Sequence, residues 1–491
     1  MLTENLPAIQ VLIPLVAAPI CALLPGRKSA WAFALIATLA TFICSMEIIR
    51  QVYVNGTMLY AMGGWAAPFG IEYSIDILSA MFLVLISGIG SFCIIYSLYS
   101  AGKEIEDSKQ PFFYTLYLLC LAGLLGIVST NDIFNIYVFL EISSLAAYAL
   151  VAMGKDRRAL IASFEYLILG TVGATFILIA IGLVYAMTGT LNITDISLRI
   201  QPVISAMPVK MAIAFFTVGL ALKIAMFPMH LWLTNAYTNA PSFVSSFLCA
   251  TSAKVGIYIF IRLIFSILGV DFSFEVLPIG KILIILGALG MLIGAVVAVM
   301  QDNLKRMLAY SSVSQIGFII LGIGLANEQG LSASLISIIS HAIAKSAMFM
   351  AAGAILYSVK GIRLSHLKGI GRRMPVTMGV FIISGLSLVG VPGTAGFIGK
   401  WYLLQATITA GMWPVFAIIL ITSLITFMYI WRVVEIAFFN YIDSSKGSVN
   451  EAPVMMLVPM VLLAALSIVI GIWPVYINGY VDMVATVLFG G

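Results

Sequence analysis

The chain has 491 residues, of which 62% are hydrophobic and only 9% are charged, and its mean hydropathy is +1.12. A soluble domain carries about 25% charged residues, so this composition excludes a soluble protein and indicates one that lies in a lipid bilayer. The net charge of +5 does not indicate nucleic-acid binding, because the basic residues lie mostly in short loops.

The composition also gives no sign of a cofactor or a metal. The five cysteines lie in apolar stretches without paired spacing, and the three histidines are far apart in the sequence. This pattern suggests neither a disulfide framework nor a metal or iron–sulfur site. The chain also lacks a phosphate-binding glycine loop and a dinucleotide fingerprint, so we expect no cofactor. With no catalytic site in view, the chain would count as an enzyme only through membership of a redox complex.

The first predicted element is a membrane helix rather than a signal peptide. The N-terminal sequence MLTENLPAIQ contains an acid and no basic residue, whereas a signal peptide begins with basic residues. Windows of about 20 residues then predict an all-α polytopic membrane protein with fourteen transmembrane helices. The predicted spans lie near 7–24, 31–50, 75–99, 112–129, 133–152, 160–187, 209–228, 241–268, 282–300, 304–325, 331–358, 375–408, 413–439 and 453–478.

The loops between these spans predict which way the chain crosses the membrane. If both termini are non-cytoplasmic, the cytoplasmic loops hold fifteen basic residues, Lys305 and Lys446 among them, and the opposite side holds four. Basic residues concentrate in cytoplasmic loops of membrane proteins. This asymmetry therefore supports an even number of spans, with both termini on the non-cytoplasmic side of the cell membrane.

Two of the predicted spans are interrupted by proline and glycine. Pro228 breaks the first, and Pro392, Gly393 and Gly396 break the second. A broken helix in a membrane is tolerated only where protein or water satisfies the freed backbone groups. Two such breaks at corresponding positions of two halves point to an internally repeated transporter.

A glutamate and a lysine inside the apolar spans are the first candidate functional residues. Glu141 lies mid-span, and Lys223 comes just before the break at Pro228. Ionisable residues at this depth are functional by default, and a nearby carboxylate changes how readily a buried lysine loses its proton. The alternatives are a protonated glutamate with one interhelical hydrogen bond, and a lysine whose amine reaches the membrane surface. Lys223 lies too far from a span end to favour the second alternative.

Four further residues extend this series. Lys254 lies about halfway along the next span, and Lys400 follows the second break. His341 and Lys345 are four residues apart and therefore share a helix face. His341 could relay protons because histidine titrates near neutral pH, although a structural histidine bonded to a backbone carbonyl remains an alternative. His230, Lys305 and Glu165 are accessory candidates.

These segments resemble the antiporter-like subunits shared by Mrp-type cation/proton antiporters, respiratory complex I and membrane-bound hydrogenases. The resemblance implies two inverted five-helix repeats and a proton path along the membrane middle. It implies N-terminal helices over 1–111, repeats over 112–268 and 269–440, and a C-terminal helix over 441–491. The segments that carry it are NDIFNIYVFLE, LKIAMFPMHLWLTNAYTNAPSFVSSFL, KVGIY, QDNLKRMLAYSSVSQIGF, HAIAKSAMFMAAG and GVPGTAGFIGKW.

The resemblance also implies roles for the candidate residues. Glu141 and Lys223 match the family's coupled acid–lysine pair, Lys254 with His341 and Lys345 matches the central relay, and Lys400 matches the terminal lysine. The lysines at 254 and 400 are most similar to the D subunit of Mrp antiporters. Two departures leave the parent complex open: WLTNAY lacks the usual proline after WL, and Glu165 stands where many relatives have lysine.

Three functions compete at this point. The first is a proton-translocating subunit of a monovalent cation/proton antiporter, with sodium or potassium as the cation. The second is a proton-pumping membrane-arm subunit of a complex I-like dehydrogenase or a membrane-bound hydrogenase. The third, a structural subunit with a dead path, is disfavoured because the full set of costly intramembrane charges is present. Both leading hypotheses imply other membrane subunits and lipids as partners.

Overall fold

The computed structural model describes residues 4–440 and 449–490, and these fold mainly into helices. A two-stranded antiparallel sheet pairs β1 (Met58–Ala61) with β2 (Glu72–Ile75), and π-helical turns cover Arg262–Leu268 and Phe272–Val276. The α-helices are α1 (Leu6–Leu23), α2 (Arg27–Asn55), α3 (Ile77–Glu104), α4 (Gln110–Ser129), α5 (Ile133–Ala152), α6 (Arg157–Thr188), α7 (Ile193–Arg199), α8 (Met207–Ile224), α9 (Leu231–Asn239), α10 (Ser242–Ala250), α11 (Ser252–Ile261), α12 (Ile279–Val299), α13 (Leu304–Gly324), α14 (Glu328–Val359), α15 (Pro375–Val389), α16 (Ala395–Thr409), α17 (Trp413–Phe438), α18 (Val454–Ile472) and α19 (Val475–Leu488).

The helices confirm an all-α polytopic membrane protein. Among the described residues, thirteen helical segments are long and apolar enough to cross a membrane. The twelfth predicted span, 375–408, is occupied by the two shorter helices α15 and α16 on either side of a break. The predicted last span ends early, because α18 stops at Ile472 and Pro474 precedes a separate helix, α19.

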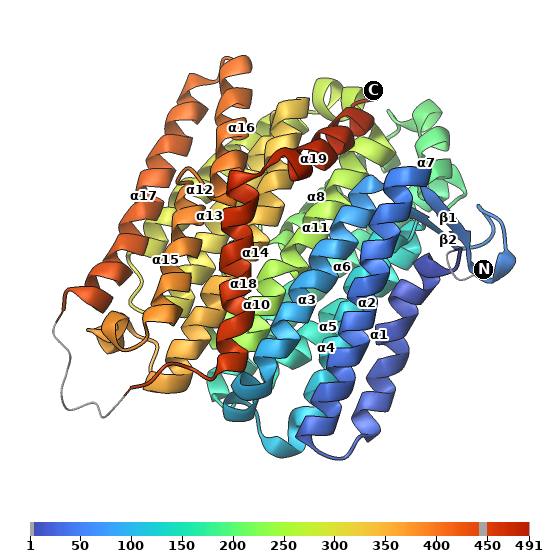
Figure 1. The fold of residues 1–491 in the computed structure, drawn as a ribbon. Coiled ribbons are helices and arrows are strands. Elements are labelled where there is room, and N and C mark those ends of the chain that lie inside the picture. Colours follow the sequence, from blue (N-terminus) through green and yellow to red (C-terminus); the bar gives the residue numbers. More distant parts are fainter. Residues whose placement is uncertain (1–3, 441–448, 491) are drawn as a thin grey trace. The chain divides into compact units, whose positions relative to one another are not determined.

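The chain forms two compact units, whose helices are labelled in Figure 1. The first contains α1, α2, the sheet, most of α3, α4 to α8 and α11. The second contains the end of α3 (Ile95–Ile105), α9, α10 and α12 to α19. The inverted repeats and their boundaries stay predictions, and both Lys446 and the beginning of the predicted segment 441–491 lie outside the described residues.

In the first unit, side-chain caps fix where α5 begins. The carboxylate of Asp132 accepts a hydrogen bond of 2.7 Å from the backbone N–H of Asn135, which satisfies one of the free donors at the helix start. The amide of Asn131 donates to Glu72 on β2 at 3.0 Å and to Thr194 on α7 at 2.9 Å. These hydrogen bonds connect the start of α5 to β2 and α7. They therefore fix the position of α5, the helix that carries Glu141, within the first unit.

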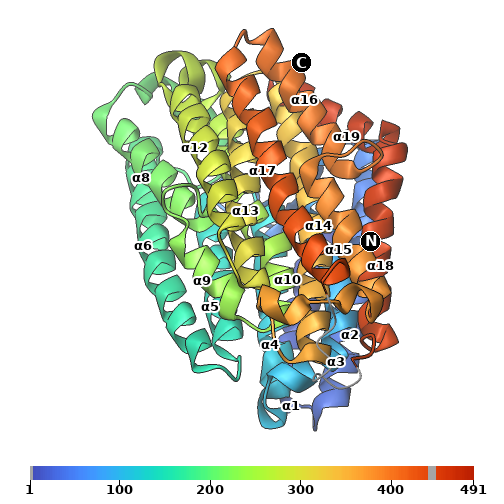
Figure 2. The same ribbon diagram turned by 90° about the vertical axis from the view of Figure 1, so that its left-hand side faces the viewer.

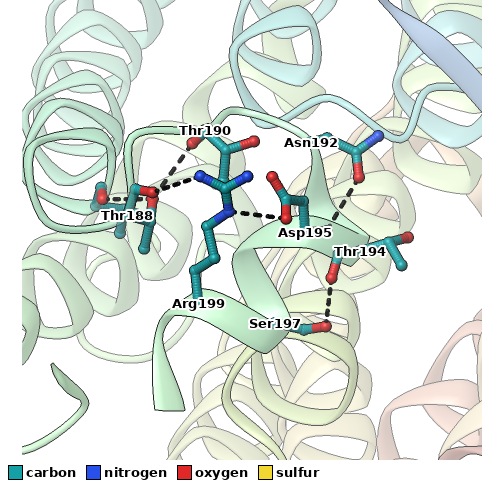
Figure 3. A network of polar contacts seen from close by, with 8 residues as sticks. Thr188, Thr190, Asn192, Thr194, Asp195, Ser197 and Arg199 are labelled. Carbon is teal, nitrogen blue, oxygen red and sulfur yellow. Dashed lines mark hydrogen bonds and ion pairs between the residues drawn. The ribbon is translucent and has the colours of Figure 1, made fainter. Parts of the chain in front are cut away.

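The connection between α6 and α7 is fixed by its own polar network (Figure 3). Asn192 accepts a hydrogen bond from the backbone N–H of Asp195 and so caps α7. Arg199 pairs with Asp195 at 2.8 Å and reaches the carbonyl of Thr188 at the end of α6 at 3.5 Å. Through these contacts, α7 connects the end of α6 to the segment that precedes α5.

In the second unit, α12 and α13 touch backbone to backbone. A Cβ atom added at Gly287 would lie 2.9 Å from the carbonyl oxygen of Gly317, and one added at Gly294 would lie 2.8 Å from the backbone nitrogen of Ser314. Small residues permit this close approach between membrane helices. Figure 2 shows α12, α13 and α17 in this part of the structure, where α12 packs against both of the others.

The first predicted break is confirmed between α8 and α9. The chain leaves the helix after Ile224, and Pro228 lies in the non-helical segment that precedes Leu231. Ala225 has a φ angle of 58°, a left-handed conformation that costs a non-glycine residue about 1–2 kcal/mol. The surrounding packing must outweigh this cost, so tertiary contacts maintain the break.

The second predicted break is confirmed between α15 and α16. Gly390 and Gly393 have φ angles of 88° and 86°, which glycine adopts at little cost, and Pro392 lies between them. Gly396, which the sequence places in the break, instead lies in the first turn of α16. A Cβ atom there would lie 1.9 Å from the carbonyl oxygen of Ser387 on α15, so Gly396 lets the two helices meet.

We expect the substitution Gly396→Ala to destabilise the protein, because the added methyl group must push α15 and α16 apart. Overpacking of this kind costs about 1–3 kcal/mol. The matched control is Gly379→Ala on α15, where a Cβ atom would meet nothing within 4 Å. Thermal unfolding of the purified protein in detergent should show a lower midpoint for Gly396→Ala only, and equal midpoints for the two variants would contradict this account.

Candidate functional site

Glu141 and Lys223, which the family resemblance pairs, lie close together inside the first unit. The Nζ atom of Lys223 lies 3.8 Å from Oε1 of Glu141, and the two side chains are 9% and 23% exposed, the lysine being the less exposed. Nζ also donates hydrogen bonds to Ser144 at 3.0 Å and to Tyr148 at 3.3 Å. These three partners are spaced i, i+3 and i+7 on α5, so one face of that helix receives the lysine.

The position of Lys223 in its helix strengthens this arrangement. Lys223 lies in the last turn of α8, directly before the break, where the free carbonyl groups give the helix end a partial negative charge. Two opposite charges about 4 Å apart interact by about 4 kcal/mol at an effective dielectric constant of 20. Removing both charges from water offsets part of this energy. The interaction energy of the pair therefore depends on the distance between Nζ of Lys223 and Oε1 of Glu141.

Lys254 is the other buried lysine of the first unit. It lies near the start of α11 and is only 1% exposed. Its helix approaches the end of α8 closely, since a Cβ atom at Gly256 would lie 3.0 Å from the side chain of Ile224. This contact keeps α11 against the helix end that carries Lys223.

The second unit contains the remaining predicted residues. His341 and Lys345 lie in α14, at 2% and 0% exposure. The amine of Lys345 donates to the carbonyl of Leu308 at 2.8 Å and to the hydroxyl of Ser311, both on α13. A backbone carbonyl and a hydroxyl thus hold this lysine.

Lys400 is held by the broken helix itself. Its amine donates to the carbonyl oxygens of Leu388 and Val389, both at 2.8 Å, and to the hydroxyl of Ser423 at 3.1 Å. The two carbonyl groups belong to the end of α15, where they have no partner within the helix. The break therefore creates the polar site that this buried amine occupies.

The accessory residues have different surroundings. His230 precedes α9 and lies between the rings of Phe227, 5.5 Å away, and Tyr310, 6.2 Å away. The sequence suggests a loop position for Lys305, but this residue lies in the first turn of α13 and is 3% exposed. Its amine donates to the carbonyl of Ala240 at 2.5 Å. Glu165 is partly buried on α6.

Sequence reasoning missed one charged cluster in the first unit. Arg262 pairs with Asp76 at 2.5 Å and donates to Tyr258 at 3.1 Å and to Ser79 at 3.0 Å. Burial raises the pKa of Asp76, but the Arg262 charge and the hydrogen bonds outweigh burial and hold this pKa below its ordinary value. The pair therefore stabilises the fold at neutral pH, and the stabilisation is lost as the pH falls through that pKa. Asp76 accepts a hydrogen bond of 2.9 Å from the backbone N–H of Ser79 at the start of α3, but no sequence signal links it to Arg262.

No metal site accompanies these residues within 4–440 and 449–490. There, no three His, Cys, Asp or Glu side chains gather as a metal ion would require. The amines of Lys223, Lys305, Lys345 and Lys400 are held by hydroxyl and carbonyl oxygens, and a carboxylate lies beside Lys223.

Comparison with known proteins places the chain among membrane-complex subunits. The family described as NADH:quinone oxidoreductase/Mrp antiporter, TM, matches residues 130–426. The chain is 37% identical to the N subunit of NADH-quinone oxidoreductase from Desulforudis audaxviator, over 96% of each chain. It is 28% identical to the D subunit of the Na(+)/H(+) antiporter from Alkalihalophilus pseudofirmus, over 89% of this chain and 87% of the relative. A chain from the membrane-bound sulfane sulfur reductase, an archaeal respiratory membrane complex, superposes with a TM-score of 0.90 at 30% identity, covering 99% of this chain and 98% of that chain.

Proposed function

Because the chain belongs to the NADH:quinone oxidoreductase/Mrp antiporter transmembrane family, we propose that it moves protons through its buried lysines as one subunit of a larger membrane complex. The observation that carries this proposal is the Lys223–Glu141 pair, 3.8 Å apart and largely buried. A buried amine beside a movable carboxylate can bind and release a proton without any other chemistry. The named relatives are subunits of such complexes, which supports partners of the same kind here.

The mechanism begins with a change in the Glu141–Lys223 separation. When the carboxylate lies close, its charge favours the ammonium form of the lysine. When the two separate, the ammonium loses this support and releases its proton toward Lys254. The proton then continues through the region of His341 and Lys345 to Lys400, whose amine has exchangeable hydrogen bonds to the end of α15. Both termini lie on the non-cytoplasmic side in this proposal, following the distribution of basic loops.

The parent complex has two candidates. A Mrp-type antiporter is supported by the lysines at 254 and 400, which match its D subunit in the family resemblance. A redox-driven complex is supported by the identity to the N subunit of NADH-quinone oxidoreductase, which exceeds the identity to the antiporter relative. Isolation of the native complex from membranes would separate them. Copurifying small antiporter subunits support the first candidate, and hydrogenase or dehydrogenase subunits support the second.

We expect Lys223→Ala to abolish proton translocation while leaving assembly largely intact. The substitution removes the titratable amine beside the helix break and leaves the hydroxyl groups on the facing helix in place. Proton flux is measured with a pH-sensitive dye in membrane vesicles that contain the assembled complex, whose amount is checked by immunoblot. Flux near the wild-type level would count decisively against the role of this lysine.

We expect Glu141→Gln to impair transport strongly and Glu141→Asp to retain part of it. Glutamine keeps the size and the hydrogen-bond acceptor but loses the charge that acts on Lys223. Aspartate keeps the charge and only lengthens the distance to Nζ, which is 3.8 Å in the native protein. The same vesicle assay compares the two variants. Equal activity in Glu141→Gln and the native protein would show that ionisation of this residue is not required.

We expect this chain alone not to exchange cations for protons. Its buried charges are mostly lysines, which repel sodium and potassium, and Glu141 is committed to Lys223. The purified chain is reconstituted into liposomes, sodium or potassium gradients are imposed, and the internal pH is followed. Robust cation-dependent proton flux that disappears in Lys223→Ala would overturn the requirement for partner subunits.

A further inference from the structure

The second unit contains a carboxylate and a buried lysine that bind the same short segment of chain. Ala240 follows the last residue of α9, and Ser242 is the first residue of α10. The Oε2 atom of Glu104, the last residue of α3, accepts hydrogen bonds from the backbone N–H and the hydroxyl of Ser242 at 2.9 and 3.1 Å. The amine of Lys305 donates to the carbonyl of Ala240 at 2.5 Å. Two residues far apart in sequence thus meet at one turn.

The two side chains also interact with each other. Glu104 acts electrostatically on Lys305, and its second carboxylate oxygen accepts a hydrogen bond of 2.8 Å from Ser100. Glu104 is partly exposed, whereas Lys305 is 3% exposed and points inward although it lies at the end of its helix. A lysine at a helix end usually extends to the membrane surface. The buried amine of Lys305, near a partly exposed carboxylate, therefore differs from this usual arrangement.

A polar seam leads inward from this turn. Lys305 and Leu308 are three residues apart on α13 and so share a face. The carbonyl of Leu308 accepts hydrogen bonds from Lys345 at 2.8 Å and from Ser312 at 3.0 Å. On the next helices, the hydroxyls of Ser246 and Ser346 lie 2.9 Å apart. The carbonyl of Leu308 therefore joins Lys345 on α14 to the helix that carries Lys305.

We propose that Glu104 and Lys305 form a proton-uptake pair that feeds Lys345 from the membrane surface near the start of α13. The proposal rests on the function proposed above and adds a second route into the series of lysines. Glu104 takes a proton from water and gives it to the uncharged amine of Lys305. The resulting ammonium transfers a proton to the uncharged amine of Lys345. Glu104 and Lys305 return to their starting forms, so each cycle moves one proton inward.

The end of α3 gives this pair a rigid support. Tyr96 donates to the carbonyl of Met350 at 3.0 Å, and Lys103 donates to the carbonyl of Tyr357 at 2.7 Å. Both contacts fix the end of α3 to α14, the helix that carries Lys345. Glu104 is thereby held at a constant position relative to the segment that it caps.

The test uses four variants of the full chain in its assembled complex. Glu104→Gln keeps the acceptor for Ser242 and removes the titratable charge, and Glu104→Asp restores that charge. Lys305→Met removes the amine. Lys305→Arg keeps a positive charge and a donor for Ala240 but does not release a proton, since an arginine stays charged in proteins. Arg306→Gln is the matched control, because it removes the neighbouring cation, which is exposed on α13.

Proton flux in vesicles, driven by whichever donor or cation gradient drives the native complex, is the measurement. We expect Glu104→Gln, Lys305→Met and Lys305→Arg each to lose at least about tenfold in flux, as expected for loss of a proton-transferring group. Glu104→Asp and Arg306→Gln should remain within a small factor of the native rate. Assembly is checked by immunoblot, and Glu104→Gln keeps the test decisive if removal of Lys305 weakens assembly.

Two results would overturn the pair. One is near-native flux in Glu104→Gln or Lys305→Met, and the other is rescue by Lys305→Arg, which would identify a fixed structural charge. Lys223→Ala in the same vesicles separates this outcome from failure of the proposed function. If Lys223→Ala loses flux while the Glu104 and Lys305 variants keep it, the uptake pair is wrong and the proposed function stands. If Lys223→Ala also keeps flux, the proposed function itself fails.

Discussion

The burial of positively charged amines in apolar helices is the constraint on which the rest of this structure depends. An unpaired charge in a membrane costs several kcal/mol, so each amine needs oxygen atoms within reach. The fold supplies them from helix ends and from serine and tyrosine side chains, and a carboxylate helps in one place. The broken helices follow from the same need, since a helix end is where carbonyl oxygens are free to accept. Lys305 and Lys400 are held in this way, whereas Lys223 and Lys345 bind side chains or a carbonyl within a helix.

The two units satisfy this constraint differently. In the first, Lys223 has a negatively charged neighbour, so its proton responds to the distance between two charges. In the second, the hydrogen bonds described above for Lys345 and Lys400 end on neutral carbonyl and hydroxyl oxygens. Lys305, also in the second unit, is influenced by the charge of Glu104, so the difference between the units concerns Lys345 and Lys400 rather than every buried lysine.

The sequence predicted the spans and the breaks well, because both depend on local chemistry. Hydropathy gives the length of a span, and proline with glycine gives the place where a helix cannot continue. Burial of Lys223 and Lys400 followed from their position inside apolar stretches. Gly396 was misplaced by a few residues, because glycine serves both as a helix breaker and as a site of close helix contact. Only the packing of α15 against α16 distinguishes these two uses.

Contacts between distant segments could not be predicted in this way. Lys305 follows a short polar stretch, which suggests a loop, and nothing local shows that its amine turns toward Ala240. Asp76 and Arg262 are 186 residues apart, so their pairing is a property of the fold alone. The Glu141–Lys223 pair was accessible only through the family resemblance, which supplied the long-range information that a single sequence lacks.

The surroundings of Lys400 have a consequence that follows from counting hydrogen atoms. An ammonium group has three hydrogens, and Lys400 uses them on three acceptors, namely the carbonyls of Leu388 and Val389 and the hydroxyl of Ser423. A neutral amine has two hydrogens and a lone pair, so after departure of the proton it still donates to both carbonyl oxygens, and the Ser423 hydroxyl turns to donate to its nitrogen. Gly390, where a Cβ atom would lie 2.6 Å from the stem of Lys400, keeps that side chain against the break. The loss of a proton therefore reverses the hydrogen bond to Ser423 on α17, while both bonds from the amine to the end of α15 remain.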